Sequence, residues 1–429
     1  MSSTIQQARR SGKPLDAAVR DDFPFYSTGA PGAALAYLDN AATTQKPAAV
    51  LNALIDYYTN ANSNVGRGYY QLAMTSTERH DAARETVRQA IGAGADDDII
   101  FTGGTTHGVN LLAATIGRRV VGKGDRVVVT GMEHNSNLLP WRRLCEESAS
   151  ELTVVPVGAD GAVDTADFAA ALGPDVPLVA IIHVSNVLGT VNPVKEMVAA
   201  AHRSGAYAVV DGAQAVAHGH TDIRDIDPDF YCFSAHKMYG PMGTGVLYAR
   251  HGLLTDLQPY QVGGGTVKGV SACEPVRYVG GPARWEAGTP DVAGAVGLAA
   301  ACDYLESLGW DAVRAHDETL VRAASDMLAD IPGARIIGAP AAGPSGLVSF
   351  VMDGIHPYDV GGHLDKHAIA VRCGVHCAST FLDDLGLLGT VRLSFGVYNT
   401  IEDLARVHDA LRTVRPGYWT SEQPTTRFL

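Results

Sequence analysis

The sequence predicts an α/β protein with a large, mostly parallel sheet covered by helices, followed by a smaller C-terminal α+β domain. Between residues 98 and 233, apolar runs of strand length alternate with longer segments of helical spacing. This alternation is typical of a parallel sheet with helices on both faces. The alternation stops after the apolar run 243–248, and a chain of 429 residues is long enough for a second domain.

Six apolar runs account for the predicted large sheet. The predicted strands are 98–101, 126–130, 152–157, 178–183, 207–211 and 229–233. The helices predicted between and beside them are 76–92, 105–117, 138–149, 165–173 and 194–204. Ligands bind such sheets beyond the carboxyl ends of the strands, so the residues that follow each strand carry the functional prediction.

The rest of the chain has a different pattern. Residues 261–290 are rich in Gly and Pro and are interpreted as functional loops. The later elements are helices 292–308 and 311–330 and strands 346–352, 368–372 and 391–395. We therefore expect an N-terminal arm (1–35) that packs on the small domain, a large α/β domain (36–305) and a small α+β domain (306–429).

Composition excludes several classes of protein. A net charge of −13 disfavours nucleic acid or an anionic membrane as the main partner. No apolar run approaches the roughly 20 residues of a membrane span, and we recognise no signal peptide, so a cytoplasmic protein is expected. Six scattered cysteines indicate mostly free thiols in a reducing compartment. Only seven residues are lysine, so few side chains are candidates for a catalytic amine.

An acid and an amine follow two neighbouring predicted strands. Asp211 ends the strand 207–211, and Lys237 comes shortly after the strand 229–233. A lysine can form a Schiff base with an aldehyde cofactor, and a nearby aspartate can keep a pyridine nitrogen protonated, as pyridoxal phosphate (PLP) requires. Either residue alone is more often a helix cap or a solvated side chain. Together they favour a PLP site.

A phosphate site and a stacking residue are predicted in the same way. The segment Gly103-Gly-Thr-Thr-His-Gly-Val-Asn110 opens a helix, where backbone N–H groups and the hydroxyls of Thr105 and Thr106 can bind phosphate. His134 follows the next strand, and its imidazole can stack on a planar ring and shuttle protons. Taken singly, the threonines are also good helix caps, and a lone histidine is more often merely hydrogen-bonded.

In their order along the chain, these segments resemble the class V aminotransferase group of fold-type I PLP enzymes. Within that group the chain is similar to group II cysteine desulfurases and selenocysteine lyases, and the resemblance covers residues 37–411. The matching motifs are Leu38-Asp-Asn-Ala-Ala42, Val184-Ser-Asn-Val-Leu-Gly-Thr190, Val210-Asp-Gly-Ala-Gln-Ala215, Phe233-Ser-Ala-His-Lys-Met-Tyr-Gly-Pro241 and Trp285-Glu-Ala-Gly-Thr-Pro290. Such a set is more specific for the fold and the cofactor than for the reaction.

The resemblance implies a cofactor role for each matching residue. Lys237 is implied as the Schiff-base lysine, His134 as the stacking residue, Asp211 as the partner of the pyridine nitrogen, and Gln214 as a neighbour of the phenolic oxygen. Thr289 would come from the partner of an obligatory homodimer. The implied phosphate contacts of the chain itself are Thr105, Thr106, Ser234 and His236.

The resemblance also implies the substrate site and places the reactive cysteine at Cys377. Desulfuration needs a thiolate that attacks the sulfur of the cofactor-bound substrate and carries it away as a persulfide. Arg392 is expected to bind the α-carboxylate by a bidentate pair, and Asn186 to lie beside the substrate imine. Arg372 and Ala41 complete the expected substrate contacts. No second ligand cluster accompanies this cysteine at structural-zinc spacing, so no metal is expected.

The resulting hypothesis is a PLP-dependent L-cysteine desulfurase. It would convert L-cysteine to L-alanine and pass the persulfide to an acceptor protein, as in iron–sulfur cluster assembly, with selenocysteine as another candidate substrate. A related PLP-dependent C–S lyase or amino-acid epimerase is the alternative. The departures from the family pattern that favour it border the substrate: Gly66 and Asn135 stand where histidines are usual, and Thr380 where a proline is usual. A non-catalytic scaffold is a third hypothesis, which the intact Lys237 and Asp211 disfavour.

Overall fold

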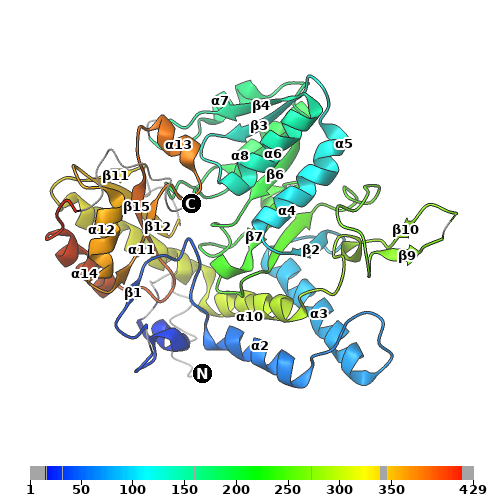
Figure 1. Ribbon diagram of the computed structural model, residues 1–429, viewed down its shortest axis with the longest axis horizontal. Coiled ribbons are helices and arrows are strands. Elements are labelled where there is room, and N and C mark those ends of the chain that lie inside the picture. Colours follow the sequence, from blue (N-terminus) through cyan, green and yellow to red (C-terminus); the bar gives the residue numbers. More distant parts are fainter. Residues whose placement is uncertain are drawn as a thin grey trace.

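The computed structural model describes residues 15, 17–30, 32–158, 160–271, 273–338 and 345–417. A seven-stranded sheet forms the centre of the molecule (Figure 1). Its strands, in spatial order, are β2 (Asp98–Thr102), β8 (Gly245–Ala249), β7 (Phe230–Ser234), β6 (Tyr207–Asp211), β5 (Leu178–Ile182), β3 (Arg126–Thr130) and β4 (Glu151–Val155). All neighbours are parallel except β8, which is antiparallel to β2 and β7. All six predicted strands of this sheet are confirmed.

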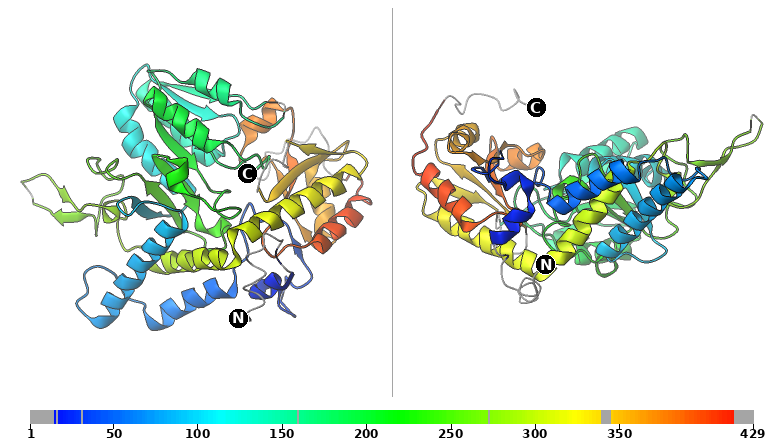
Figure 2. Two further views of the ribbon diagram at one scale, coloured as in Figure 1. Left: turned by 180° about the vertical axis from the view of Figure 1, so that it is seen from behind. Right: turned by 90° about the horizontal axis from the view of Figure 1, so that it is seen from below.

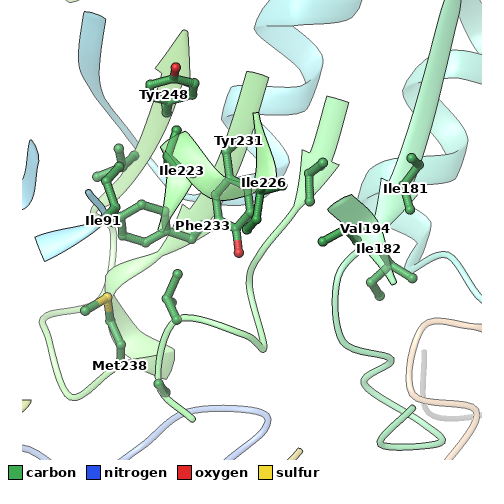
Figure 3. Packing of buried hydrophobic residues seen from close by; sticks show 14 of the residues in the cluster. Ile91, Ile181, Ile182, Val194, Ile223, Ile226, Tyr231, Phe233, Met238 and Tyr248 are labelled. Atoms are coloured by element: carbon green, nitrogen blue, oxygen red, sulfur yellow. The ribbon is translucent and has the colours of Figure 1, made fainter. Parts of the chain in front are cut away.

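The strands bury both of their faces, because successive side chains alternate between two cores. In β6, for example, Ala208 and Val210 belong to one hydrophobic cluster and Val209 to the other. Figure 3 shows part of the first cluster, with Tyr231 and Phe233 of β7 packed near other apolar side chains. This two-sided burial explains why the strands are continuous apolar runs in the sequence.

Helices cover the two faces of the large sheet. Those among the described residues up to 308 are α2 (Ala48–Asn60), α3 (Gln71–Ala90), α4 (Thr105–Leu112), α5 (Arg118–Val120), α6 (Asn135–Ser148), α7 (Thr165–Ala171), α8 (Val194–Ser204), α9 (Ile223–Ile226) and α10 (Val292–Leu308), with a π-helical turn η3 (Ala113–Gly117) after α4. Side chains of α8 and α10 belong to the first hydrophobic cluster, whereas those of α4 and α6 belong to the second. Helix α6 begins three residues before its predicted start because the side chain of His134 caps it by accepting a hydrogen bond from the Ser136 amide.

A second, four-stranded sheet follows in the chain. Its order is β11 (Ala334–Ile337), β12 (Leu347–Met352), β15 (Thr390–Ser394) and β14 (Arg372–Gly374), and every pairing is antiparallel. Its helices are α11 (Trp310–Ala329), α12 (Pro357–Asp365), α13 (Ser379–Asp384) and α14 (Ile401–Leu411). Helices α10 and α11 carry the chain from the large sheet to this small sheet (Figure 2).

Short strands and short helical turns complete the fold. The strand predicted at 368–372 is wrong as a single element, because β13 (Ile369–Ala370) pairs with β1 (Ala36–Tyr37) while β14 pairs with β15. The Gly/Pro-rich loops contain a hairpin, β9 (Val267–Gly269) and β10 (Arg277–Tyr278), that projects from the body (Figure 1). Short helical turns are η1 (Ala17–Asp22), η2 (Pro24–Tyr26), η4 (Ala235–Lys237) and η5 (Pro282–Arg284).

The expected N-terminal arm is only partly covered, since residues 1–14, 16 and 31 lie outside the described residues. In the described part, the fully buried Phe23 packs its ring against Tyr239, Tyr304 and Tyr398. These rings come from the large sheet's loops, from α10 and from the segment after β15, so Phe23 lies where the two parts of the fold meet. None of the described helices is both long enough and apolar enough to span a membrane.

Candidate active site

A cavity of about 280 Å³ lies beyond the carboxyl ends of β5, β6 and β7. The small sheet contributes side chains from β14, β15 and the loop after β14 to its wall. Thirteen of the residues predicted from the sequence line it: Ala41, Thr105, Thr106, His134, Asn186, Asp211, Gln214, Ser234, His236, Lys237, Arg372, Cys377 and Arg392. Thr289 does not; it is exposed on the loop before α10.

The acid and the amine lie at the floor of this cavity. Asp211 is the last residue of β6 and is buried, and one of its carboxylate oxygens accepts a hydrogen bond from the Ala213 amide (2.9 Å). Lys237 ends the turn η4 directly after β7. Burial raises the pKa of Asp211 and lowers that of Lys237 to about 8, while the attraction between the two opposite charges opposes both shifts. The pair therefore shares one weakly solvated site.

His134 supplies a neutral imidazole to the same cavity. Its Nδ1 accepts the hydrogen bond of the Ser136 amide (3.0 Å), so the ring carries its hydrogen on Nε2. Burial, together with the nearby charges of Lys237 and Arg392, lowers the pKa of His134 to about 4. At neutral pH the ring is therefore uncharged, which suits a group that stacks on a planar ring.

One end of the cavity has the donors of an anion site. Helix α4 begins at Thr105, and Thr105 and Thr106 of its first turn line the cavity. The backbone N–H groups of a first turn have no partner within their own helix and favour an anion. The Thr105 amide donates to Ser234 Oγ (2.9 Å), and the Thr106 and Ser136 hydroxyls lie 2.7 Å apart. The Nδ1 atom of His236 is buried and has no hydrogen-bond partner among the described residues. An orphaned polar atom of this kind indicates a ligand group.

The other end of the cavity holds two arginines around one carboxylate. Asp39 accepts two hydrogen bonds from Arg372 (3.1 and 2.6 Å) and lies 3.4 Å from Nη2 of Arg392. Arg392 is buried, donates from Nη1 to the carbonyl oxygen of Asn186 (2.8 Å), and keeps a buried Nε without a partner in the described structure. Burial lowers the pKa of Arg392 to about 10. Two guanidinium groups and one carboxylate leave a net positive charge for an anionic substrate.

Cys377 lies on the loop between β14 and α13, and its side chain is exposed. His376 and Cys377 both have left-handed backbones, with φ of 51° and 54°. Two contacts hold the loop against the large sheet: the Asn135 amide donates to the Cys377 carbonyl, and Asn186 Nδ2 donates to the His376 carbonyl, each at 2.8 Å. Asn186 therefore fastens the cysteine loop and lines the cavity, while its buried Oδ1 has no hydrogen-bond partner among the described residues.

Two residues that organise this site were not foreseen. Asp39 lies within a motif that we singled out, but its pairing with Arg372 links positions 333 residues apart, which no local pattern indicates. Glu133 is buried beside His134 and accepts hydrogen bonds from the Thr130 hydroxyl, the Asn137 amide group and the Ile182 backbone amide. An acid next to a strand-end histidine was the available signal for it. Burial raises the pKa of Glu133 to about 8.

The donor set fits PLP. The cofactor has an aldehyde, a pyridine nitrogen and a phosphate, and the cavity offers an amine, a carboxylate and a helix start for these three groups. The unpartnered Nδ1 of His236 lies among the residues assigned to the phosphate. Gln214, which donates a hydrogen bond to the Ala41 carbonyl (2.8 Å), lies three residues after Asp211 and lines the same cavity.

Known cysteine desulfurases are similar to this chain in sequence and in fold. A probable cysteine desulfurase of Halalkalibacterium halodurans is 43% identical over 382 residues, which are 89% of this chain and 93% of that protein. The crystal structure of the cysteine desulfurase CsdA of Escherichia coli matches with a TM-score of 0.85 and 35% identity, over 92% of this chain and 98% of the other. An apo cysteine desulfurase of Thermococcus onnurineus matches with a TM-score of 0.87 and 34% identity, over 93% and 98%.

The family model described as aminotransferase class-V matches residues 36–407, which is most of the chain. The match includes both sheets and all the cavity-lining residues, so it covers the complete site rather than one part of the fold. Together with relatives about 40% identical over nearly their whole length, it settles the family. This chain belongs to the class-V aminotransferase family.

Proposed function

We propose that this chain is a PLP-dependent cysteine desulfurase, which converts L-cysteine to L-alanine and retains the sulfur as a persulfide on Cys377. The observation that carries the proposal is the meeting of Lys237, Asp211, Arg392 and Cys377 at one cavity. The amine and the buried acid would bind the cofactor, the guanidinium would bind the substrate carboxylate, and the thiol would accept the sulfur. The similarity to proteins named cysteine desulfurases supports the same reaction.

The residues that hold the cofactor are those at the floor of the cavity. Lys237 would bind its aldehyde carbon, Asp211 would pair with its ring nitrogen, and the start of α4 with Ser234 and His236 would bind its phosphate. When bound, the cofactor supplies an electron sink for the α-carbon of the substrate. The role of Asp211 is to keep its charge next to the ring nitrogen. The hydrogen bond from the Ala213 amide and the charge of Lys237 favour the charged carboxylate against burial, which raises its pKa.

The remaining residues act on the substrate. Arg392 binds the α-carboxylate through the face that its unpartnered Nε presents, and Lys237 Nζ takes the α-proton and later returns a proton to the product. A pKa near 8 lets the amine exchange a proton at neutral pH. The thiolate of Cys377 attacks the substrate sulfur, so an S–S bond forms as the C–S bond breaks. L-cysteine and the enzyme thiol thus give L-alanine and the enzyme persulfide.

We also propose that the enzyme acts as a cytoplasmic homodimer that hands its sulfur to an acceptor protein, as iron–sulfur cluster assembly requires. The exposure of Cys377 supports transfer to an outside thiol. Exposed large apolar side chains, including Tyr69, Tyr70 and Val262, support a subunit interface. Thr289, exposed and outside the cavity of its own chain, then completes the phosphate site of the partner.

Incubation with L-cysteine tests the reaction. We expect alanine to form, the bound-cofactor absorbance to require Lys237, and the Cys377 peptide to gain the mass of one sulfur. Cys377→Ala should abolish the persulfide and reduce alanine formation to the background rate, whereas Cys273→Ala, which removes another exposed cysteine, should keep both. Wild-type turnover of L-cysteine by Cys377→Ala without reductant would instead favour a C–S lyase, and racemised cysteine would favour an epimerase.

A further inference from the structure

The carbonyl oxygen of His236, which belongs to the peptide bond that leads into Lys237, receives an unusual number of hydrogen bonds. Four donors converge on it: the Thr44 amide at 3.0 Å, and the Thr43 hydroxyl, the Thr44 hydroxyl and Lys46 Nζ at 3.1 Å each. A carbonyl oxygen has two lone pairs, so this acceptor is more than saturated. All four donors come from one segment, 43–46, about 190 residues away in the chain.

The Thr44 hydroxyl also closes the turn that contains Lys237. In a continuing α-helix the His236 carbonyl would accept from the Gly240 amide. Here the Gly240 amide donates to Ala235 instead (2.9 Å), and Tyr239 has a left-handed backbone with φ of 68°. Thr44 Oγ1 accepts from the Tyr239 amide (2.9 Å) and donates to the His236 carbonyl. One hydroxyl thus bridges the backbone on both sides of Lys237.

The segment that provides these donors is itself anchored on its other side. The Ala41 amide donates to Ser394 Oγ of β15 (2.9 Å), and the Gln45 amide donates to the Tyr398 hydroxyl (2.9 Å). Ala41 also accepts a hydrogen bond from Gln214 (2.8 Å). The segment 41–46 therefore spans from the small sheet to the turn of Lys237 and is held at both ends.

Lys46 is placed to donate hydrogen bonds but not to react with the cofactor. Its ammonium group is partly buried, donates to the carbonyls of Thr44 (2.6 Å) and His236, and has no carboxylate partner among the described residues. Burial lowers the pKa of Lys46 to about 8, so the group still carries its charge at neutral pH. This ammonium group donates its hydrogen bonds to backbone carbonyls, and Lys46 does not line the cavity. Lys46 is therefore not a second amine for the cofactor.

We propose that Lys46, acting with the Thr44 hydroxyl, is a positioning residue that fixes the turn of Lys237 so that its amine points at the cofactor aldehyde. The inference rests on the proposed function only in taking Lys237 as the cofactor lysine. A hydrogen bond from a charged donor is stronger than one from a neutral donor, so the ammonium holds this peptide more firmly than a hydroxyl alone. The segment then aligns the amine with β15, the strand that carries Arg392.

Two variants test the inference. Lys46→Met keeps the stem and removes the donor, and Thr44→Val keeps the shape and removes the hydroxyl. In cofactor-free protein, we expect each to accelerate hydrogen exchange in the peptide 237–240 at least tenfold. We also expect each to slow, at least tenfold, the attachment of added PLP to Lys237, trapped by borohydride and measured by mass. Lys46→Arg, which restores a cationic donor, should recover most of both losses, and Lys195→Met, at an exposed lysine, should resemble the wild type.

The results separate a positioning role from mere stability. A lower melting temperature with unchanged exchange in 237–240 and an unchanged attachment rate would overturn the inference, as would full attachment rates in both variants. Should Lys46→Met fail to fold, Thr44→Val carries the same test. If the wild type took up no PLP at all, the proposed function would fail, but the exchange measurement on the turn of Lys237 would still decide the inference.

Discussion

At the scale of single residues, the guanidinium groups of Arg372 and Arg392 contact the same carboxylate, that of Asp39, but unequally. Asp39 accepts two hydrogen bonds from Arg372 but approaches Arg392 only to 3.4 Å. Its negative charge therefore offsets the charge of Arg372 more than that of the buried Arg392, which stays available to an anionic ligand. The half-exposed Arg372 is screened by water, whereas the buried Arg392 is not. The two arginines are therefore unequal, and Arg392 is the stronger anion receptor.

Replacing Arg392 by lysine should mainly weaken substrate binding. A single ammonium cannot contact the Asn186 carbonyl, Asp39 and a substrate carboxylate together, as the guanidinium fork can. Losing one charge-assisted hydrogen bond, worth about 1.5–3 kcal/mol, corresponds to a roughly 10- to 100-fold higher KM for L-cysteine. Steady-state alanine formation measures it. Arg372→Lys is the control, with an expected change of less than about threefold; equal effects of both variants would contradict the assignment.

At the scale of elements, the cysteine loop is held in a conformation that its residues do not favour. A left-handed backbone costs a non-glycine residue roughly 1 kcal/mol, and His376 and Cys377 adopt it in succession. The contacts from Asn186 and Asn135 offset this cost and keep the loop on the large sheet. The thiol is thus presented by a loop that two hydrogen bonds fasten to the large sheet, while His376 Nε2 lies 2.8 Å from the Thr390 hydroxyl of β15.

Asn186→Ala should loosen this loop. Removing one neutral hydrogen bond costs about 1 kcal/mol, which corresponds to roughly fivefold more frequent opening. The Asn135 amide donates to the Cys377 carbonyl, so its hydrogen exchange reports the opening directly and should quicken by about the same factor. Asn52→Ala, on the exposed face of α2, is the matched control and should leave this exchange unchanged. An unaltered Asn135 amide in Asn186→Ala would mean that the loop is held by other contacts.

The elements that the sequence predicts well are those with a local pattern. Asp211 and Lys237 end or follow continuous apolar strands, and the carboxyl ends of parallel strands meet at one edge, so their proximity could be foreseen. The direction of β8 could not, because a fully buried apolar run is the same pattern in either direction. The roles of Asp39 and Lys46 could not be predicted either, because their contacts join segments about 190 to 330 residues apart.

At the scale of the whole molecule, the burial of three histidines makes the stability of the fold sensitive to acid. Burial lowers the pKa of His134, His183 and His236 to about 4, against about 6.5 in an unfolded chain. Between these values the unfolded chain binds protons that the native protein does not, so stability falls as the pH drops from 6.5 towards 4. Glu133 acts in the opposite sense, because its raised pKa contributes stability that is lost as the pH rises from about 4.5 towards 8.

Because these contributions overlap, a difference between variants isolates one of them. His183, whose Nδ1 lies 2.9 Å from the Tyr231 hydroxyl, can be replaced by glutamine, which keeps an acceptor but does not titrate. From pH 6.5 to pH 5, the wild type should lose about 1.5 kcal/mol more unfolding free energy than His183→Gln, by linkage from a pKa of about 4. Urea unfolding at constant ionic strength measures both. His220→Gln, at an exposed histidine, should follow the wild type; parallel curves for wild type and His183→Gln would show that His183 protonates equally in both states.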